Sequence, residues 1–250
     1  MYKIPELISF PNLEHTFSDI TDGNMANMIL GKQMDEKEVL KNREILLKNS
    51  GFDINQTVYM WVRHGNEGLV ADLKLAGKSM RDKNFAVQSD GIITNKKGLN
   101  LFLLIGDCVP VVFFDPKKKV LGVLHVSRKN VTGVVQVMIK KLRVEFGVNL
   151  NNLSVGIGPA ARRDTFIFEN LSRLNKLVWE PFIEETIDHK FKIDLVGFCR
   201  KQLHIEGVIQ ENIFDCGIDT ISDKRFFSHY RDFKNGVEDN GRFACVVGLR

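Results

Sequence analysis

The sequence predicts a mixed domain of the α+β or irregular α/β class that spans residues 1–250. Apolar runs of strand length and amphipathic segments of helical length are mixed along the chain, without the strict strand–helix alternation of a doubly wound sheet. The chain contains no repeat, low-complexity segment or linker rich in Pro, Gly or Ser, so we expect one domain. With 44% hydrophobic residues, that domain can bury a substantial core.

The first half of the chain predicts one helix and several strands. Apolar side chains at near-helical spacing indicate a helix over residues 36–50, with Asp35 as its N-cap and Gly51 at its C-terminal end. Four short apolar or β-rich runs follow, and their lengths suit buried strands better than helices. These predicted strands cover residues 57–62, 99–105, 109–114 and 120–126.

The second half is richer in helical patterns. Residues 131–146 place apolar side chains on one side, and Gly147 suits the end of that helix. The remaining patterns predict, in chain order, a strand at 153–157, helices at 173–186 and 194–206, and a closing strand at 245–249.

Charge and cysteine usage narrow the class of protein. The formal net charge is only +4, and the one dense basic run, residues 117–119, fits a solvated turn, so we expect no nucleic-acid partner. No apolar run approaches the roughly 20 residues that cross a bilayer, and residues 1–6 lack the apolar core of a secretory signal. Four cysteines without a C-x-x-C pair favour a reduced, cytoplasmic protein.

Three residues are candidate metal ligands. His64 follows a predicted strand, Cys108 interrupts two apolar runs, and His125 ends another strand. Each residue alone has an ordinary structural explanation. Together, two imidazoles and one thiolate suit zinc, and three protein ligands leave a fourth position open, as in catalytic zinc sites. The spacing alone leaves open whether the three side chains converge.

Polar neighbours of these residues strengthen the case for an organised site. Asp107 is a carboxylate in an apolar stretch, and a buried carboxylate needs partners. Asp107 could orient a ligand or transfer a proton. Arg128 and Lys129 follow His125 and precede a predicted helix, so they could bind an anion there.

Around these residues the chain resembles the laccase-domain, or polyphenol-oxidase-like, family. Its members were first described as multicopper oxidases and are now regarded as zinc-dependent purine nucleoside phosphorylases. The matching motifs run through nearly the whole chain in the family's order. They are Arg-His-Gly at 63–65, Ser-Asp-Gly-Ile-Ile-Thr at 89–94, Gly-Asp-Cys-Val-Pro at 106–110, Asp-Pro at 115–116, His125, Ile-Gly-Pro at 157–159, Phe-Phe-Ser at 226–228, Arg-Asp at 231–232 and Gly-Arg at 241–242.

The resemblance implies a single α/β sandwich-like domain and a zinc site made by His64, Cys108 and His125. It implies phosphorolysis of purine nucleosides, together with deamination of adenosine and cleavage of methylthioadenosine. Copper is the metal historically proposed for the family. We expect purine nucleoside and phosphate as small-molecule substrates, a monomer or weak homodimer, and phosphate binding by Arg63, Arg128, Lys129 and Arg231.

The chain departs from the family pattern beside the ligands. Gly106 replaces the usual alanine, and Tyr230 replaces an arginine. After His125, Arg128 replaces a tryptophan, and Lys129 stands where the family has arginine. Lysine keeps the positive charge but loses the planar fork that holds phosphate through two hydrogen bonds. Metal binding is therefore a safer inference than the identity of the substrate.

Three other functions remain open. In a metal-free cysteine hydrolase, Cys108 would be the nucleophile and His125 the base. A copper oxidase of phenols fits poorly, because a multicopper cluster needs many histidines and the chain has six, scattered along its length. A non-catalytic metal-binding protein descended from the enzymes would explain the substitutions near His125.

Overall fold

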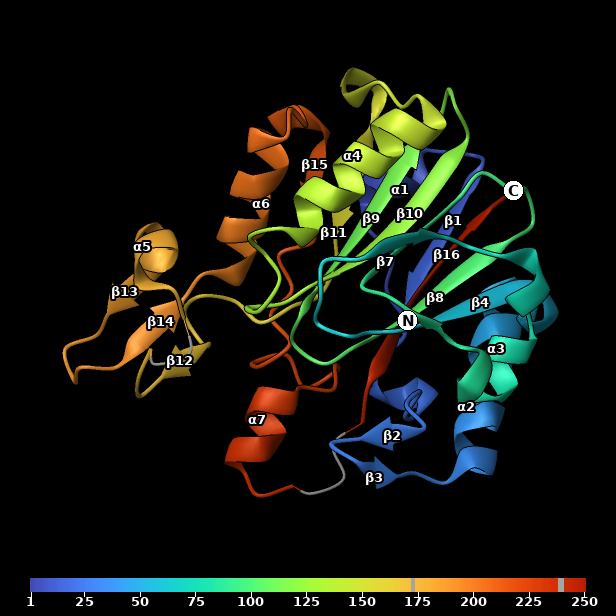
Figure 1. Cartoon of the computed structure of the whole chain (residues 1–250). Helices are drawn as coiled ribbons and strands as arrows, with labels where there is room; N and C mark the ends of the chain where they lie inside the picture. Colours follow the sequence, from blue (N-terminus) through green and yellow to red (C-terminus); the bar gives the residue numbers. More distant parts are fainter. Residues whose placement is uncertain (172–173, 238–240) are drawn as a thin grey trace.

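Two β-sheets pack face to face, and helices cover their outer faces (Figure 1). The computed structural model describes residues 1–171, 174–237 and 241–250. The five-stranded sheet has the order β1 (Leu13–Phe17), β16 (Phe243–Leu249), β8 (Asn100–Ile105), β4 (Thr57–Trp61) and β6 (Val87–Gln88). The six-stranded sheet has the order β15 (Ile213–Asp215), β11 (Ser154–Ile157), β9 (Val109–Asp115), β10 (Val120–Val126), β7 (Gly91–Thr94) and β5 (Gly68–Val70).

Two small sheets and seven α-helices complete the described part of the chain. The small sheets are β12 (Ile167–Phe168), β14 (Phe191–Ile193) and β13 (Ile183–Glu185), and the hairpin β2 (Met28–Ile29) and β3 (Lys32–Gln33). The helices are α1 (Pro5–Ile8), α2 (Glu36–Asn49), α3 (Lys78–Arg81), α4 (Val134–Phe146), α5 (Lys176–Trp179), α6 (Leu195–Ile205) and α7 (His229–Lys234). Within the described ranges, no helix is both long and apolar enough to cross a bilayer.

The main core lies between the two large sheets and follows from the alternation of side chains along each strand. On β8, Leu101 and Leu103 point into this inter-sheet core, whereas Phe102 points to the opposite face. On β9, Val112 points into the inter-sheet core and Phe113 points outward. Both faces of each central strand are therefore buried, which is why these strands read as continuous apolar runs in the sequence.

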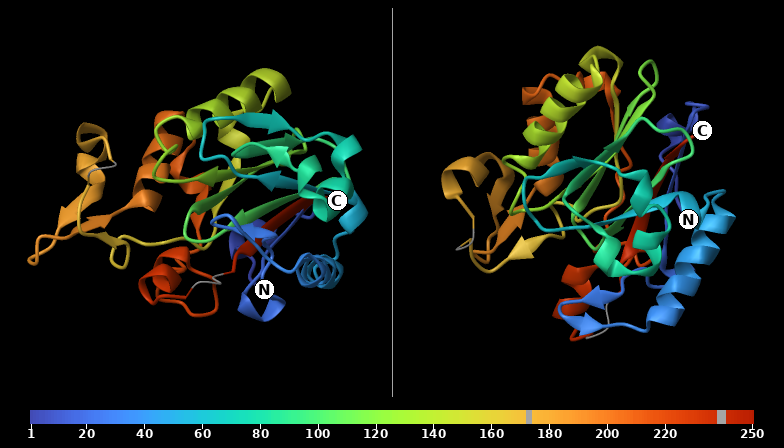
Figure 2. Two further views of the ribbon diagram at one scale, coloured as in Figure 1. Left: turned by 60° about the horizontal axis from the view of Figure 1, so that its bottom comes forward. Right: turned by 45° about the vertical axis from the view of Figure 1, so that its right-hand side comes forward.

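Helices on the outer faces make this a four-layer arrangement (Figures 1 and 2). Apolar residues of α4 and α6 pack on the outer face of the six-stranded sheet. Apolar residues of α2 and α3 pack on the outer face of the five-stranded sheet. The mixed α/β sandwich predicted from the sequence is confirmed, and the solved relative described below shares it.

Most long elements lie where the sequence predicted them. The predicted helix over 36–50 is α2, and the side chain of Asp35 caps it by accepting hydrogen bonds from the amides of Lys37 and Glu38 at 2.9 and 3.2 Å. Gly51 follows with a positive φ of 73°. The predicted strands of the first half are confirmed as β4, β8, β9 and β10, and the predicted helix over 194–206 is confirmed as α6.

Two predicted helices differ from the structure. The helix predicted over 131–146 begins only at Val134, because residues 127–133 form hydrogen-bonded turns organised by the Asn130 side chain. The helix predicted over 173–186 is wrong: Arg173 lies outside the described residues, α5 ends at Trp179, and 183–185 is strand β13. Pro181 explains the break, because proline cannot donate the helical hydrogen bond and clashes with the preceding turn.

A buried histidine on β1, a strand that the sequence did not predict, contributes to stability. His15 is 1% exposed, and its Nε2 accepts a hydrogen bond from the amide of Ile4 at 2.8 Å. Burial, aided by the charge of Lys3, lowers the pKa of His15 from its ordinary 6.5 to about 4. The folded protein therefore holds this ring neutral in a range where the unfolded chain protonates it.

We expect the free energy of unfolding to fall as the pH drops from 6.5 to 4. A depressed folded-state pKa contributes stability that is full above the unfolded pKa and is lost as the pH falls through the folded pKa. The contribution of His15 is on the order of 3 kcal/mol. Urea unfolding at several pH values measures the free energy of unfolding as a function of pH, and this dependence should be flatter for His15→Gln than for the wild type. The exposed His204→Gln should keep the wild-type slope, and an equally steep slope in both variants would contradict this role for His15.

Candidate metal centre

The fold brings His64, Cys108 and His125 together where the two large sheets meet at one end. His64 follows β4 of the five-stranded sheet, and His125 lies on β10 of the six-stranded sheet. Cys108 lies in the turn that carries the chain from β8 in one sheet to β9 in the other. One nitrogen of each histidine and the Cys108 sulfur all lie within 4.8 Å of one another. The convergence that spacing left open is therefore present.

The donor set and its geometry fit a single zinc ion. A thiolate and two imidazoles are ordinary zinc ligands, and three protein ligands leave a coordination position for water or substrate. The two imidazole rings are nearly perpendicular, with centroids 5.0 Å apart. His125 is buried, Cys108 is partly buried and His64 is exposed, so the cluster is reachable from solvent on the His64 side.

Asp90 organises both histidines. Its carboxylate is completely buried and lies 2.8 Å from Nδ1 of His125, and its carbonyl oxygen accepts the His125 amide at 2.7 Å. A carboxylate at Nδ1 favours the tautomer in which Nε2 is free to bind a metal. The hydrogen bonds to His125 and to backbone amides outweigh the effect of burial, which opposes ionisation, and lower the pKa of Asp90.

The same carboxylate shapes the loop that carries His64. It accepts hydrogen bonds from the amides of Arg63, His64 and Gly65 at 3.2, 3.0 and 2.8 Å. His64 has a positive φ of 57°, a conformation that costs about 1–3 kcal/mol in a non-glycine residue. Hydrogen bonds to a charged group contribute about 1.5–3 kcal/mol each, so Asp90 can hold this loop in its strained shape.

Cys108 and His125 form a polarised pair. Burial opposes ionisation of the thiol, but the charge of His125 and hydrogen bonds to both histidines lower the pKa of Cys108 to about 6. For His125, burial opposes protonation, but Cys108 and Asp90 raise its pKa to about 9. The cluster therefore favours a thiolate at neutral pH, which is the form of cysteine that binds a metal, whereas His125 must release a proton before its Nε2 can bind one.

Asn130 ties the loop after His125 to the loop that contains His64. Its side-chain amide donates to the carbonyl oxygens of Gly65 and His125 at 3.0 and 3.2 Å, and its Oδ1 accepts the Ser127 amide at 2.7 Å. Residues 127–133 therefore form a compact turn that starts directly at a candidate ligand. The turn fixes the backbone positions of Arg128 and Lys129.

The predicted catalytic residue Asp107 is buried, and its carboxylate binds the segment around residues 220–230. It accepts hydrogen bonds from the Thr220 hydroxyl at 2.7 Å and from the Tyr230 amide at 2.6 Å. Burial raises its pKa despite these bonds. Asp107 has a positive φ of 85°, so it also shapes the turn that presents Cys108. These contacts favour a role for Asp107 in positioning Cys108. Proton transfer by Asp107 stays a prediction.

The predicted phosphate ligands lie in different surroundings. The backbone of Arg63 is bound to Asp90, and its side chain is exposed, as is that of Lys129. Arg231 donates from Nη1 to the Thr220 carbonyl at 2.9 Å, from Nη2 to the Phe226 carbonyl at 3.0 Å, and from Nε to its neighbour Asp232 at 3.0 Å. Its guanidinium thus braces the 220–226 loop, and phosphate binding by Arg231 would compete with these bonds.

Two departures from the family pattern meet in one aromatic cluster. The guanidinium of Arg128 lies over the ring of Phe168, 4.2 Å from its centroid. Tyr230 packs against Phe166 and Phe168 with ring centroids 5.3 and 5.5 Å away. A guanidinium over an aromatic face is a favourable contact, because the positive charge is attracted to the electron-rich ring. Arg128 and Tyr230 are therefore compatible substitutions.

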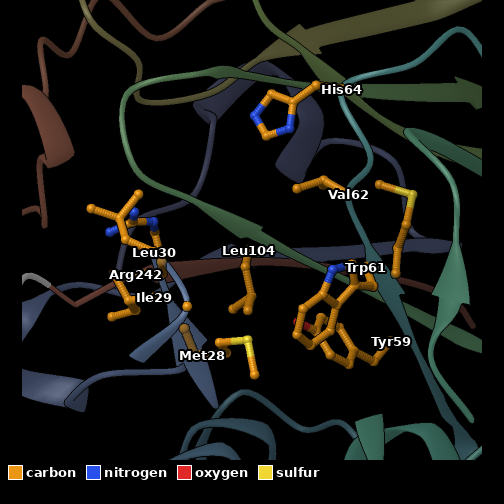
Figure 3. A pocket seen from close by; sticks show the side chains of 12 residues that line it. Met28, Ile29, Leu30, Tyr59, Trp61, Val62, His64, Leu104 and Arg242 are labelled. Atoms are coloured by element: carbon orange, nitrogen blue, oxygen red, sulfur yellow. The ribbon is translucent and has the colours of Figure 1, made fainter. Parts of the chain in front are cut away.

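A cavity of about 270 Å³ opens beside His64 (Figure 3). Its walls are mostly apolar and come from the β2–β3 hairpin and from β4 and β8, with Arg242 as a charged member. Arg242 packs on Gly106, where an added Cβ would lie 2.8 Å from the arginine Cδ. The glycine in place of the family's alanine gives this arginine its room.

Comparison with known proteins settles the family. The family model described as "Multi-copper polyphenol oxidoreductase laccase" matches residues 18–250. The chain belongs to this laccase family. The resemblance noted in the sequence is thereby confirmed, and the name of the family refers to copper.

Relatives within the laccase family carry a different description. Purine nucleoside phosphorylase YlmD of Bacillus subtilis (strain 168) is 28% identical over 222 residues, which cover 86% of this chain and 78% of that protein. Purine nucleoside phosphorylase LACC1 of Homo sapiens is 29% identical over 214 residues, 82% of this chain but 47% of that protein. The crystal structure of YlmD from Geobacillus stearothermophilus has a TM-score of 0.83 at 25% identity and covers 96% of this chain and 93% of that one.

Two residues of the site received no role from the sequence. Asp90 and Arg242 both lie in motifs shared with the laccase family, at 89–94 and 241–242. Their membership in these motifs was the available signal. What the sequence lacks is the direction of the side chains, since Asp90 is 35 residues from His125, and Arg242 is more than 130 residues from Gly106.

We expect Asp90→Asn to weaken zinc binding by about 10–100-fold, the usual effect of losing a metal ligand's hydrogen-bonding partner. The amide keeps the shape of the side chain but removes the charge that favours the metal-binding tautomer of His125. Competition with a chromophoric chelator measures the affinity. The exposed carboxylate Glu44, changed to Gln, is the matched control. Equal affinity in Asp90→Asn and the wild type would contradict the organising role of Asp90.

Proposed function

We propose that the protein is a zinc-dependent purine nucleoside phosphorylase. The observation that carries the proposal is the convergence of His64, Cys108 and His125, oriented by a buried carboxylate. Membership in the laccase family and the names of the relatives support the reaction class. The open coordination position and the neighbouring cavity give a substrate room beside the cluster.

His64, Cys108 and His125 would hold the metal, and Asp90 would orient His125. A bound zinc ion would supply Lewis-acid polarisation of an oxygen atom at the open position. Asp90 also fixes the 63–65 loop, so the protein would have little rearrangement to make on loading. Preorganisation of this kind keeps a site accurate enough for catalysis.

In phosphorolysis, a phosphate oxygen forms a bond to C1′ of the ribose while the bond from C1′ to the purine nitrogen breaks. The electron pair leaves with the purine, which then takes up a proton. The transition state has oxocarbenium character, so an anion must be held close to the sugar. Arg63, Arg128 and Lys129 are the cationic residues proposed to hold phosphate on this side of the site.

The proposal includes two further activities expected from the resemblance. Methylthioadenosine would undergo the same bond exchange at C1′ as other purine nucleosides. Adenosine could instead be deaminated, with water adding at C6 of the purine and ammonia leaving. Assays of all three reactions on one preparation would rank them.

A metal-free cysteine hydrolase is the second candidate, and the close contact of Cys108 with His125 favours it. A thiolate beside an imidazole is the arrangement that activates a nucleophile. In the zinc enzyme a metal would shield this sulfur, whereas in the hydrolase it would be exposed to alkylation. Iodoacetamide treatment with and without prior chelation therefore separates the two functions: protection that chelation removes supports zinc.

We expect about one zinc per chain in protein purified without a histidine tag, and its loss in Cys108→Ser. The serine hydroxyl is a far poorer zinc ligand than a thiolate. Mass spectrometry of metals measures the content, and phosphorolysis of inosine should fall with it. Cys216→Ser, a partly buried cysteine outside the cluster, is the matched control. A metal-free wild type would transfer support to the hydrolase, and zinc without any turnover would support a non-catalytic binder.

We expect Lys129→Ala to raise the KM for phosphate about tenfold, the size expected for one hydrogen bond to a charged ligand. The KM for the nucleoside should change little, because the exposed amine of Lys129 lies in the loop proposed to face phosphate. Steady-state kinetics with each substrate varied in turn separates the two constants. Lys224→Ala removes an exposed lysine from another loop as a control. An unchanged KM for phosphate would exclude Lys129 from the phosphate site.

A further inference from the structure

Two neighbouring loops at one end of the sandwich are rich in lysine. The β9–β10 loop contributes three of these residues and the β7–β8 loop contributes two. Strands β7 and β10 pair antiparallel, with Thr94 opposite Leu121, so the two loops leave the six-stranded sheet side by side. The resulting lysine patch consists of Lys96, Lys97, Lys117, Lys118 and Lys119, all of them exposed. The structure therefore places a second basic loop beside the turn at 117–119.

The backbone of the β9–β10 loop is held from below by a buried carboxylate. Asp115 is completely buried, and its Oδ1 accepts the amides of Lys117 and Lys118 at 2.8 and 3.0 Å. Lys119 has a positive φ of 53°, which turns the chain back into β10. The carboxylate thus fixes the loop while the lysine side chains stay in solvent. The two loops keep a net positive charge even when Asp115 is counted.

The charges of the lysine patch are not compensated by neighbouring carboxylates. Among the residues that the structure describes, none of the five lysines forms an ion pair, whereas Lys192, on the small sheet, lies 3.3 Å from Glu184. The formal net charge of the whole chain is +4, so the patch carries more positive charge than the chain as a whole. Without the patch the protein would be close to neutral. This end of the sandwich is therefore the place where an anionic partner is attracted most strongly.

The composition of the two loops favours a diffuse anionic surface over a nucleic acid. Residues 95–99 and 116–119 contain no arginine and no aromatic residue. Arginine supplies the planar fork that suits nucleic-acid phosphates, and aromatic rings stack on bases, whereas lysine is a hydrated point charge. Clusters of about four to eight basic residues attract anionic phospholipid headgroups without any specific contact.

The lysine patch and the metal cluster lie at opposite ends of one strand. Strand β9 starts directly after Cys108 and ends at Asp115, where the lysine loop begins. Its seven residues span about 23 Å at a rise of about 3.3 Å per residue. A surface that contacts the patch would therefore leave the metal cluster and the opening beside His64 accessible to small molecules.

We propose that the lysine patch is a docking surface for the anionic headgroups of a phospholipid bilayer. Both loops project from the same end of the packed sandwich, so their five charges can approach a flat surface together. The contact is electrostatic and reversible, because the loops have no exposed apolar side chain to insert. The proposal is independent of the reaction at the metal cluster.

Co-sedimentation of the full chain with vesicles tests the proposal. We expect binding to vesicles of phosphatidylglycerol and phosphatidylcholine in equal parts, and no binding to phosphatidylcholine alone. Raising the salt from about 0.1 M to about 1 M shortens the screening length from about 10 Å to about 3 Å and should release the protein. Absence of binding to the anionic vesicles at the lower salt would overturn the proposal.

A charge-matched pair of variants separates the patch from the overall charge. The patch variant carries Lys117→Gln, Lys118→Gln and Lys119→Asn. Asparagine suits the positive φ at position 119. The control variant replaces three exposed lysines of α2, as Lys37→Gln, Lys41→Gln and Lys48→Gln. The patch variant should bind anionic vesicles about 100-fold more weakly, at about fivefold for each lysine near the surface, and the control should bind like the wild type. An equal loss in both variants would overturn the proposal.

The second loop gives an independent test. Lys96→Gln combined with Lys97→Gln leaves the Asp115 turn intact and should weaken binding about 25-fold, at the same fivefold for each lysine. Wild-type affinity in this variant would overturn the role of the β7–β8 loop in the docking surface.

Duplex DNA of about 20 base pairs is the competing probe, since its phosphates also attract lysine. We expect the wild type to bind it more weakly than the anionic vesicles at the same salt. Tighter binding to the duplex, lost in the patch variant, would assign the patch to nucleic acid and overturn the lipid proposal.

Discussion

The carboxylate of Asp90 is the interaction on which the site depends. One buried group receives three amides from the loop of His64 and faces the ring of His125. An unpaired carboxylate at this depth would be strongly destabilising, so its partners and its burial are mutually required. The same contacts that satisfy the charge also place two candidate ligands. The same hydrogen bonds of Asp90 therefore stabilise the fold and position the candidate metal ligands.

Around that centre the structure separates supporting groups from exposed ones. Asp107 and Arg231 bind neighbouring segments and hold the 220–230 region against the Cys108 turn. Arg63 and Lys129 are exposed, and they lie next to His64 and four residues after His125 in the sequence. Charged residues that look alike in the sequence thus divide into those that shape the site and those that can meet a ligand.

The sequence predicted the central strands because burial on both faces leaves continuous apolar runs at 100–105, 109–115 and 120–126. It missed β1, because His15 and Thr16 are polar although buried and therefore interrupt the apolar run that indicates a buried strand. The candidate ligands, which the fold brings together, were predictable from residue types and family motifs. The role of Asp90 was not, since it requires the pairing of β7 with β10, which no local pattern encodes. The helix predicted over 173–186 failed because Pro181 interrupts an otherwise helical composition.

The three candidate ligands belong to different halves of the sandwich. His64 follows a strand of one sheet, His125 lies on the other, and Cys108 lies on the crossing between them. An ion bound by all three residues would cross-link the two sheets at one end of the sandwich. Sliding of one sheet against the other would pull the donor atoms apart. Coordination of the ion would therefore depend on the relative position of the two sheets. Retention of the ion then measures how well the apolar layer between the sheets is packed, even for changes made far from the ligands.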